Sequence, residues 1–242
     1  RWVKEMEMKK QGDHRRVGPN QGLFFMHDLT PGSAFFLTHG ARVYNTLVNF
    51  IKAEYWKRGY EEVMTPNIFS TDLWKISGHY QKYQDDMFLF NTKDNVEFAM
   101  KPMNCPGHCL MFRHLQGKLS HNRLPLRMAD FGVLHRNERS GALGGLTRVR
   151  RFQQDDAHIF CRPDQVRNEV VGALNFMRDI YKIFGMSFSL MRSTRPDSAV
   201  GADTPEGLAL WDSAEQALTD ALNEFAGEDW KDDVGGGAFY GK

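Results

Sequence analysis

Apolar side chains recur at helical spacing in several stretches of the chain. Val43, Leu47 and Tyr55 are among those that predict a helix over 41–58, which Gly59 should end. Further helices are predicted over 71–78, 105–115, 163–184 and 205–226.

Apolar or alternating runs between these helices predict strands. The predicted strands cover 60–68, 87–91, 96–101, 126–135, 147–160 and 187–192. The runs 126–135 and 147–160 are expected to form one antiparallel pair across the glycine-rich loop 141–145. Pro66 cannot donate to a strand ladder, so its strand should lie at an edge or an interface. Residues 1–30 are expected to be a helical or irregular lead-in. Antiparallel hairpins with helices between them predict an α+β fold.

Composition changes this picture little. The chain has 242 residues, enough for one large domain or two small ones with a sizeable core. With 41% hydrophobic and 25% charged residues, it has the composition of an ordinary soluble globular protein. The formal net charge is only +1, so any basic surface for nucleic acid must be local or lie on another domain.

The cysteine count and the N-terminus bear on the compartment. Three cysteines make a disulfide framework improbable and indicate a reducing environment. The chain has no apolar run of transmembrane length, so no membrane association is expected. The first ten residues lack the apolar stretch of a signal peptide. We therefore expect a cytoplasmic protein, although a mitochondrial protein whose transit peptide was removed would look the same.

Two groups of arginines face each other across the hairpin predicted around residues 141–145. His135-Arg136-Asn137-Glu138 precedes the loop, and Arg148-Val149-Arg150-Arg151-Phe152 follows it. Guanidinium groups match phosphate oxygens in bidentate fashion, Phe152 could stack on a base, and Glu138 could accept from an exocyclic amine. On composition alone, an exposed hairpin with solvated charges is the better interpretation.

A second group of residues suits a metal or an amine. Asp156 and His158 share one face of a predicted strand, because they are two residues apart. Cys105 and His158 could bind zinc together, although spacing alone supports this weakly. Cys105, His108 and Cys109 are a rival set on one helical turn, without a clear fourth ligand.

These segments resemble a known family. The arginine hairpin resembles motif 2 of the class II aminoacyl-tRNA synthetases, and the whole chain resembles the catalytic domain of the threonyl-tRNA synthetases. Residues 59–66 resemble motif 1. Other matching segments are 12–16 with 22–24, 101–108, 153–160, 193–196 and 236–241. The resemblance covers nearly all 242 residues and implies a class II fold, an antiparallel sheet flanked by helices.

The resemblance implies roles for the motif 2 residues. Arg136 and Arg148 would be catalytic: Arg136 would bind the α-phosphate of ATP and the carboxylate side of threonine, and Arg148 the γ-phosphate. Glu138 would read the adenine amine, and Phe152 would stack on the ring. Mg²⁺ would accompany ATP. Pro66 would lie at the interface of a homodimer.

The resemblance also implies a zinc-dependent amino-acid pocket. Cys105 and His158 would be two of three zinc ligands. Threonine would be contacted by Met103, Gln154, Asp156 and Tyr240. Zinc with three protein ligands keeps open positions, which threonine can fill with its amine and hydroxyl. Valine has no hydroxyl, and a pocket that reads shape alone separates such isosteres only about a hundredfold.

The family continues beyond the last residues of this chain. Motif 3 and the third zinc ligand, a histidine, are expected beyond the chain end, and the family's editing and anticodon-binding domains are expected to be absent from residues 1–242. We therefore expect residues 1–242 to be a catalytic domain truncated before motif 3, inactive or nearly so by itself. The expected substrates are ATP, L-threonine and tRNA(Thr). Two alternatives stay open: a prolyl- or seryl-type synthetase, and a catalytically dead paralogue that binds RNA or regulates.

Overall fold

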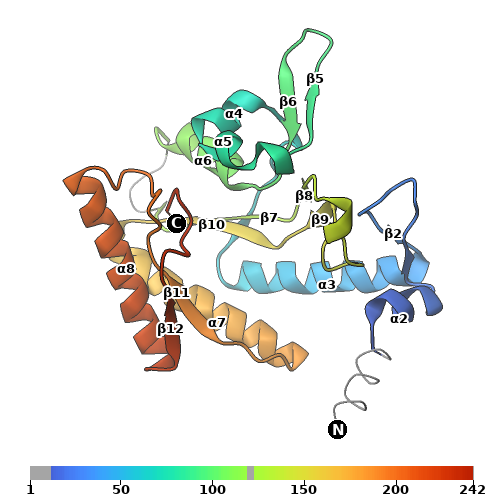
Figure 1. The fold of residues 1–242 in the computed structure, drawn as a ribbon. Helices are drawn as coiled ribbons and strands as arrows, with labels where there is room; N and C mark the ends of the chain where they lie inside the picture. Colours follow the sequence, from blue (N-terminus) through green and yellow to red (C-terminus); the bar gives the residue numbers. More distant parts are fainter. Residues whose placement is uncertain (1–11, 119–122, 242) are drawn as a thin grey trace. The chain divides into compact units, whose positions relative to one another are not determined.

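The computed structural model describes residues 12–118 and 123–241. The chain divides into two compact units, one ending at His158 and one beginning at Ile159 (Figure 1). The prediction that residues 1–242 form one catalytic domain stays a prediction.

The first unit opens with a helix, a small hairpin and a long helix. These are α2 (His14–Asn20), β1 (Phe24–Phe25), β2 (Phe35–Phe36) and α3 (Thr38–Lys57). The Asp13 side chain caps α2 by accepting from the Arg15 N–H at 2.9 Å. The predicted helix over 41–58 is confirmed as α3. The predicted lead-in over 1–30 is α2 and β1 in its described part, and residues 1–11 lie outside the described residues.

The predicted strand over 60–68 is wrong as one continuous element. β3 (Glu61–Glu62) pairs in parallel with β7, whereas β4 (Ile68–Ser70) pairs antiparallel with β6. Between them, both the N–H and the hydroxyl of Thr65 donate to the Asp130 carboxylate, at 3.1 and 2.8 Å. These side-chain bonds replace a ladder there. Pro66 is exposed in this connecting segment, where its missing N–H removes no ladder bond.

A helical and hairpin layer follows. It consists of α4 (Thr71–Ile76), α5 (His79–Tyr83), a 3₁₀ turn (Gln84–Asp86), β5 (Leu89–Asn91), β6 (Glu97–Met100) and α6 (Cys105–Leu115). β5 and β6 pair antiparallel and project beyond α4 and α5 (Figure 1). Trp74, Met87 and Ala99 form a buried core cluster. The predictions for 87–91, 96–101 and 105–115 are confirmed, and the helix predicted over 71–78 is confirmed as α4.

The arginine hairpin is built from shorter strands than predicted. The strands are β7 (Leu126–Asp130), β8 (Val133–His135), β9 (Arg151–Gln153) and β10 (Asp156–Phe160), with a 3₁₀ turn over Ser140–Ala142. β8 and β9 pair antiparallel as predicted. β7 instead lies between β10 and β3 in another sheet. The run breaks after Asp130, whose Oδ1 accepts from the Gly132 N–H at 2.7 Å.

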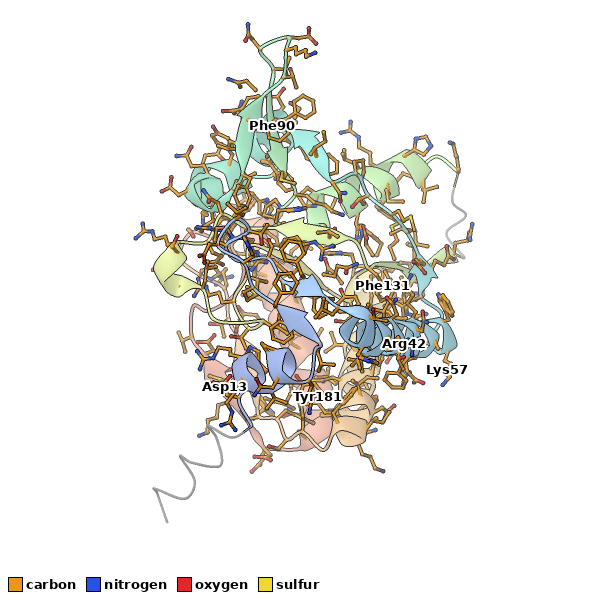
Figure 2. The ribbon with its side chains drawn as sticks, turned by 90° about the vertical axis from the view of Figure 1, so that its right-hand side faces the viewer. Asp13, Arg42, Lys57, Phe90, Phe131 and Tyr181 are labelled. Atoms are coloured by element: carbon orange, nitrogen blue, oxygen red, sulfur yellow. The ribbon has the colours of Figure 1, made fainter. Side chains whose placement is uncertain are left out.

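In the first unit, side chains of α3 pack against residues that follow β7 and β9. The Phe131 ring lies edge-on to Tyr55 at a centroid distance of 5.4 Å, and the Lys52 ammonium lies 4.9 Å from the same ring. Figure 2 labels Phe131. The Tyr55 hydroxyl donates to the Asp155 carbonyl at 2.6 Å. The long helix is thereby fixed against the segment that joins β9 to β10.

The second unit packs two helices beside a pair of strands. After a 3₁₀ turn (Pro163–Gln165) come α7 (Val166–Phe184), β11 (Leu190–Ser193), α8 (Pro205–Ala226) and β12 (Trp230–Asp233). α7 and α8 contact each other and bury Phe176, Ala221 and Leu222. Both helices were predicted. β12, which pairs in parallel with β11, was not. None of the helices in the described part of the chain is long and apolar enough to span a bilayer.

Candidate functional site

Three of the residues predicted to bind the nucleotide line one cavity of the first unit. Its volume is about 320 Å³. The lining residues are Tyr83, Asp86, Met87, Pro102, Met103, Arg136, Glu138 and Arg148. Arg136, Glu138 and Arg148 come from the motif 2 hairpin, and Met103 is a predicted threonine contact. The structure therefore places predicted nucleotide residues beside a predicted amino-acid residue.

Arg136 is held at the end of β8 by backbone and aromatic contacts. Its N–H donates to the Arg150 carbonyl at 2.8 Å, and its Nε donates to the Pro102 carbonyl at 3.3 Å. Its guanidinium carbon lies 5.1 Å from the centre of the Phe152 ring, a cation–π contact. This arrangement leaves guanidinium N–H groups for an anion in the cavity. Phe152 does not line this cavity, and its stacking on adenine stays a prediction.

Glu138 and Arg148 form an ion pair at the mouth of the hairpin. Glu138 Oε2 accepts from Arg148 Nε at 2.9 Å and lies 2.8 Å from Nη2. The Arg148 side chain is 60% exposed and that of Glu138 only 15%. The arginine is therefore the more solvent-accessible member of the pair.

Arg150 donates hydrogen bonds to backbone carbonyls, although the sequence pattern placed it among the arginines suited to phosphate. Its Nε donates to the Glu138 carbonyl at 2.9 Å, and its Nη1 to the Pro31 carbonyl at 3.3 Å. Its N–H donates to the Gly32 carbonyl at 2.7 Å. Gly32 has a φ of +81°, and a Cβ there would lie 2.9 Å from Arg150 Cγ, so glycine suits this close approach. Arg150 thus ties the motif 2 loop to the Pro31 turn.

The predicted zinc residues lie on elements that contact each other. Cys105 is the first residue of α6 and is buried, and His108 follows one turn later. Nδ1 of His108 lies 2.7 Å from Nδ1 of His158 on β10. Residues three apart on a helix are neighbours, so the Cys105 thiol belongs to the same region as the His158 ring. A thiolate and an imidazole are donors that suit zinc. Zinc binding by this pair stays a prediction.

The rival zinc set is not assembled. Within residues 12–118 and 123–241, no group of three His, Cys, Asp or Glu side chains is placed to hold a metal ion. Cys109 is exposed, whereas His108 is fully buried, with its Nε2 3.6 Å from Asp130 Oδ2. The His108 ring is thus directed at Asp130 and His158.

A buried charged network surrounds this region, and sequence reasoning missed it. Lys101 and Asp130 have side chains only 1% and 2% exposed, with Lys101 Nζ 3.7 Å from Asp130 Oδ2. Lys101 Nζ also donates to the Thr65 hydroxyl at 2.8 Å. Burial alone would raise the pKa of the Asp130 carboxyl, but the nearby His108 ring, hydrogen bonds from Thr65 and Gly132 and the Lys101 charge hold it below its usual value. Asp130 is therefore a buried anion.

The other three residues predicted to contact the substrate threonine lie in different surroundings. Asp156 Oδ2 accepts from the Asn104 amide at 3.1 Å, beside the start of α6. Gln154 is exposed between β9 and β10. Tyr240 belongs to the second unit, where its ring lies edge-on to Phe239 at 4.8 Å. The threonine contacts of all three stay predictions.

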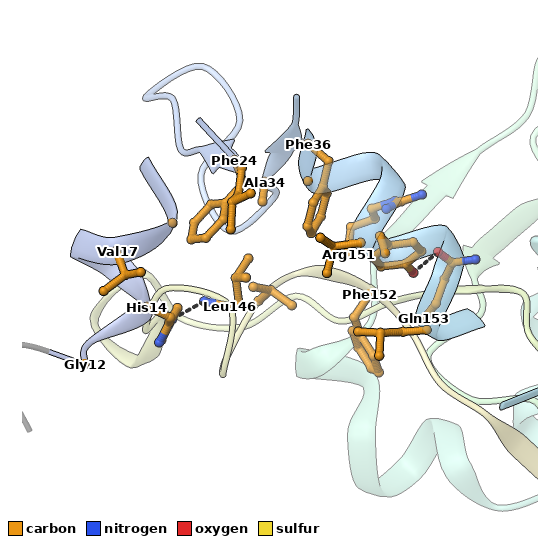
Figure 3. A pocket seen from close by; sticks show the side chains of 17 residues that line it. Gly12, His14, Val17, Phe24, Ala34, Phe36, Leu146, Arg151, Phe152 and Gln153 are labelled. Carbon is orange, nitrogen blue, oxygen red and sulfur yellow. Dashed lines mark hydrogen bonds between the residues drawn. The ribbon is translucent and has the colours of Figure 1, made fainter. Parts of the chain in front are cut away.

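A second, larger cavity of about 520 Å³ is lined in part by the residues of β9. Its lining is mainly apolar and comes from α2, β1, β2, α3 and the hairpin, including Val17, Phe24, Phe36, Leu146 and Phe152 (Figure 3). Two polar contacts hold it in shape. His14 Nε2 accepts from the Leu146 N–H at 2.9 Å, and the Tyr44 hydroxyl donates to the Gln153 side chain.

Comparison with known proteins gives a consistent result. Residues 88–220, more than half of the chain, match the tRNA synthetase class II core domain (G, H, P, S and T). The chain is 56% identical over 240 residues to threonine–tRNA ligase 1, cytoplasmic, of Rattus norvegicus, covering 99% of this chain and 33% of that protein. It therefore spans about a third of the length of the curated relatives it matches.

Solved structures agree with the fold. The RNA-binding domain of threonyl-tRNA synthetase from Cryptosporidium parvum Iowa II superimposes with a TM-score of 0.85 and 55% identity, over 94% of this chain and 55% of that one. Prolyl-tRNA synthetase of Giardia lamblia, in complex with prolyl-adenylate, gives a TM-score of 0.61 at 18% identity, over 68% of this chain and 34% of that one. The latter shows the fold alone. The predicted α+β class II fold and the resemblance to threonyl-tRNA synthetases are confirmed.

Proposed function

Because the chain belongs to the class II tRNA synthetase core family, we propose that it carries the amino-acid activation site of a threonine–tRNA ligase. The observation that carries this proposal is the 320 Å³ cavity, where Arg136, Glu138 and Arg148 meet Met103. Its polar residues suit a nucleotide, and Met103 lies just before α6, where the amino acid would bind.

In this proposal the cavity binds ATP in a bent form. Arg136 binds the α-phosphate, Arg148 the γ-phosphate, and Glu138 accepts from the adenine amine. A carboxylate oxygen of threonine attacks the α-phosphorus in line, and the bond to the pyrophosphate leaving group breaks. Fixed guanidinium groups stabilise the charge that develops in this step. Mg²⁺ would screen the phosphates when ATP binds.

Threonine selection is proposed for the region around α6 and β10. Cys105 and His158 would hold zinc, which when bound offers open positions to the threonine amine and hydroxyl. Asp156 would pair with the same amine, and Asn104 fixes the carboxylate for this role through its 3.1 Å hydrogen bond. Serine keeps the hydroxyl and would pass this test.

We further propose that the protein forms a homodimer, acts on tRNA(Thr) and works in the cytoplasm. Apolar side chains are exposed on neighbouring elements near the chain start: Phe35 is 45% exposed on β2, and Val43 and Leu47 are 53% and 46% exposed on α3. Pro66 is exposed as well. Exposed apolar side chains of this kind support a protein interface, and Val43 and Leu47 also line the 520 Å³ cavity. The cytoplasmic placement rests on the names of the relatives.

Binding of a non-hydrolysable threonyl-adenylate mimic tests the proposal. Calorimetry on the chain should show tight binding, which Arg136→Gln should weaken. The same titrations on a longer protein that includes motif 3 decide the alternative: if it binds neither this mimic nor ATP, it is a catalytically dead paralogue and the proposal fails.

Metal analysis separates a threonine enzyme from a prolyl- or seryl-type enzyme. Cys105→Ala should lose bound zinc, whereas Cys109→Ala, the exposed cysteine of the same helix, should keep it. His158→Ala should abolish threonine binding and leave ATP binding largely intact, because the nucleotide residues lie elsewhere. Zinc retained by Cys105→Ala, or threonine bound by His158→Ala, would overturn the assignment.

A further inference from the structure

Two imidazole rings meet next to the proposed zinc residues. The Nδ1 atoms of His108 and His158 are 2.7 Å apart, and the rings meet edge to face at a centroid distance of 4.7 Å. A nitrogen pair at this distance is a hydrogen bond. One nitrogen therefore carries a proton, and the other carries a lone pair.

Asp130 decides which nitrogen carries the proton. The Nε2 atom of His108 lies 3.6 Å from Asp130 Oδ2, and the two side chains are 0% and 2% exposed. A buried carboxylate attracts a proton and repels a lone pair, so it favours the His108 tautomer protonated at Nε2. That tautomer has a lone pair at Nδ1. His158 must then donate from its own Nδ1, and its lone pair lies at Nε2.

The Asp130 carboxylate, next to which the His108 ring lies, is held rigidly. Asp130 accepts from the Thr65 N–H at 3.1 Å, the Thr65 hydroxyl at 2.8 Å and the Gly132 N–H at 2.7 Å. A Cβ at Gly132 would lie 2.7 Å from Asp130 Oδ1, so a larger residue would displace the carboxylate. The carboxylate is therefore fixed in rotation as well as in position.

We infer that His108 is a positioning residue, which holds His158 in the tautomer that presents Nε2 to a metal ion. This inference rests on the proposed role of His158 as a zinc ligand. A ligating imidazole needs a lone pair on the ligating nitrogen, and a hydrogen bond at its other nitrogen fixes tautomer and ring orientation. Loss of such a partner costs about 10- to 100-fold in metal affinity.

The tautomer can be measured without any metal. Long-range ¹⁵N NMR of the metal-free chain at about pH 8 reports which nitrogen of His158 carries the proton. The expected result is a proton on Nδ1. It should persist in His108→Gln, whose amide oxygen can accept while its NH₂ group faces Asp130. It should give way to a mixture in His108→Phe. A wild-type proton on Nε2, or an unchanged tautomer in His108→Phe, would overturn the inference.

Zinc affinity is the second readout, measured by competition with a chromophoric chelator. His108→Phe should bind zinc about 10- to 100-fold more weakly. His108→Gln, and the control His114→Gln on the exposed side of α6, should stay near the wild-type value. ATP binding must be unchanged in each variant, which shows that the fold survives. Unchanged zinc affinity in His108→Phe would contradict the inference. These zinc titrations use a longer protein that carries the expected third ligand as well as residues 1–242. If its wild-type form binds no zinc, the proposed zinc site is refuted, while the tautomer still decides the role of His108.

Discussion

Arg148 donates from Nε to the Oε2 atom of Glu138 at 2.9 Å, and its Nη2 lies 2.8 Å from the same atom. Both side chains line the proposed nucleotide cavity. The pair therefore occupies the two groups that are proposed to read the adenine amine and the γ-phosphate. In the proposed function a nucleotide would draw Arg148 away from Glu138, and the 60% exposure of the Arg148 side chain keeps the cost of breaking this ion pair small.

Replacing Glu138 should separate these two effects. Glu138→Ala releases Arg148, so inorganic tripolyphosphate should bind up to about fivefold more tightly, the range of an exposed ion pair. The same change removes the proposed acceptor for the adenine amine, so the preference for ATP over GTP should disappear. Calorimetric titrations with the three ligands measure both effects. An undiminished preference for ATP would show that Glu138 does not read the base.

Arg136 should matter more than its neighbours for nucleotide binding. Arg136→Gln should weaken ATP binding by about 10- to 100-fold, because a charge-assisted hydrogen bond to phosphate is lost. Arg139→Gln, an exposed arginine of the same loop outside the cavity lining, is the matched control. Equal losses of ATP affinity in the two variants would show that Arg136 contributes only its positive charge and makes no specific contact with the nucleotide.

The buried pair of Lys101 and Asp130 should dominate the stability of its region. Asp130→Asn leaves the Lys101 ammonium buried without its anion, which costs about 3–5 kcal/mol of unfolding free energy. Lys75→Ala, which breaks an exposed ion pair with Asp72, should cost less than about 1 kcal/mol. Urea unfolding monitored by tryptophan fluorescence measures both. Similar values for both variants would contradict the assignment of a buried ionic core.

Acidification should destabilise the chain through His135. Burial, together with the charges of Arg151 and Lys101, lowers the pKa of this imidazole below its usual 6.5. The unfolded chain then takes up the proton first as the pH falls. Unfolding free energy is therefore lost below about pH 6.5 and is fully present above it. His135→Gln should lose less stability between neutral and mildly acidic pH than wild type. His39→Gln, an exposed histidine, should behave like wild type.

The sequence predicted the elements whose signals are local. Helix α8 begins at Pro205 and ends before Gly227, and both boundaries are visible in the sequence. The prediction of one continuous strand through Pro66 was wrong, because Thr65 donates hydrogen bonds to the Asp130 side chain and not to the backbone of a neighbouring strand. Strand β12 was missed because its partner β11 lies some forty residues away in the chain, and residues 230–233 carry no alternating pattern of their own.

The site was predictable only where motif residues are adjacent in sequence. Arg136, Glu138 and Arg148 belong to one hairpin, and the structure brings them together at one cavity. Lys101 and His108 were not predicted to be buried polar residues, because single charged or imidazole side chains usually lie at the surface. Their partners Asp130 and His158 come from other elements, so only the folded chain reveals the network.

Amino-acid discrimination tests the proposed zinc-dependent threonine site most directly. Thermal unfolding of this chain, and of a longer protein that includes motif 3, should be followed with threonine, serine or valine at equal concentration, with zinc and again after chelation. The longer protein decides the outcome, because it carries the expected third zinc ligand. Threonine and serine should raise the melting temperature only when zinc is present, and valine should have no effect in either condition. Stabilisation by valine equal to that by threonine, or stabilisation by threonine that survives chelation, would contradict the proposal.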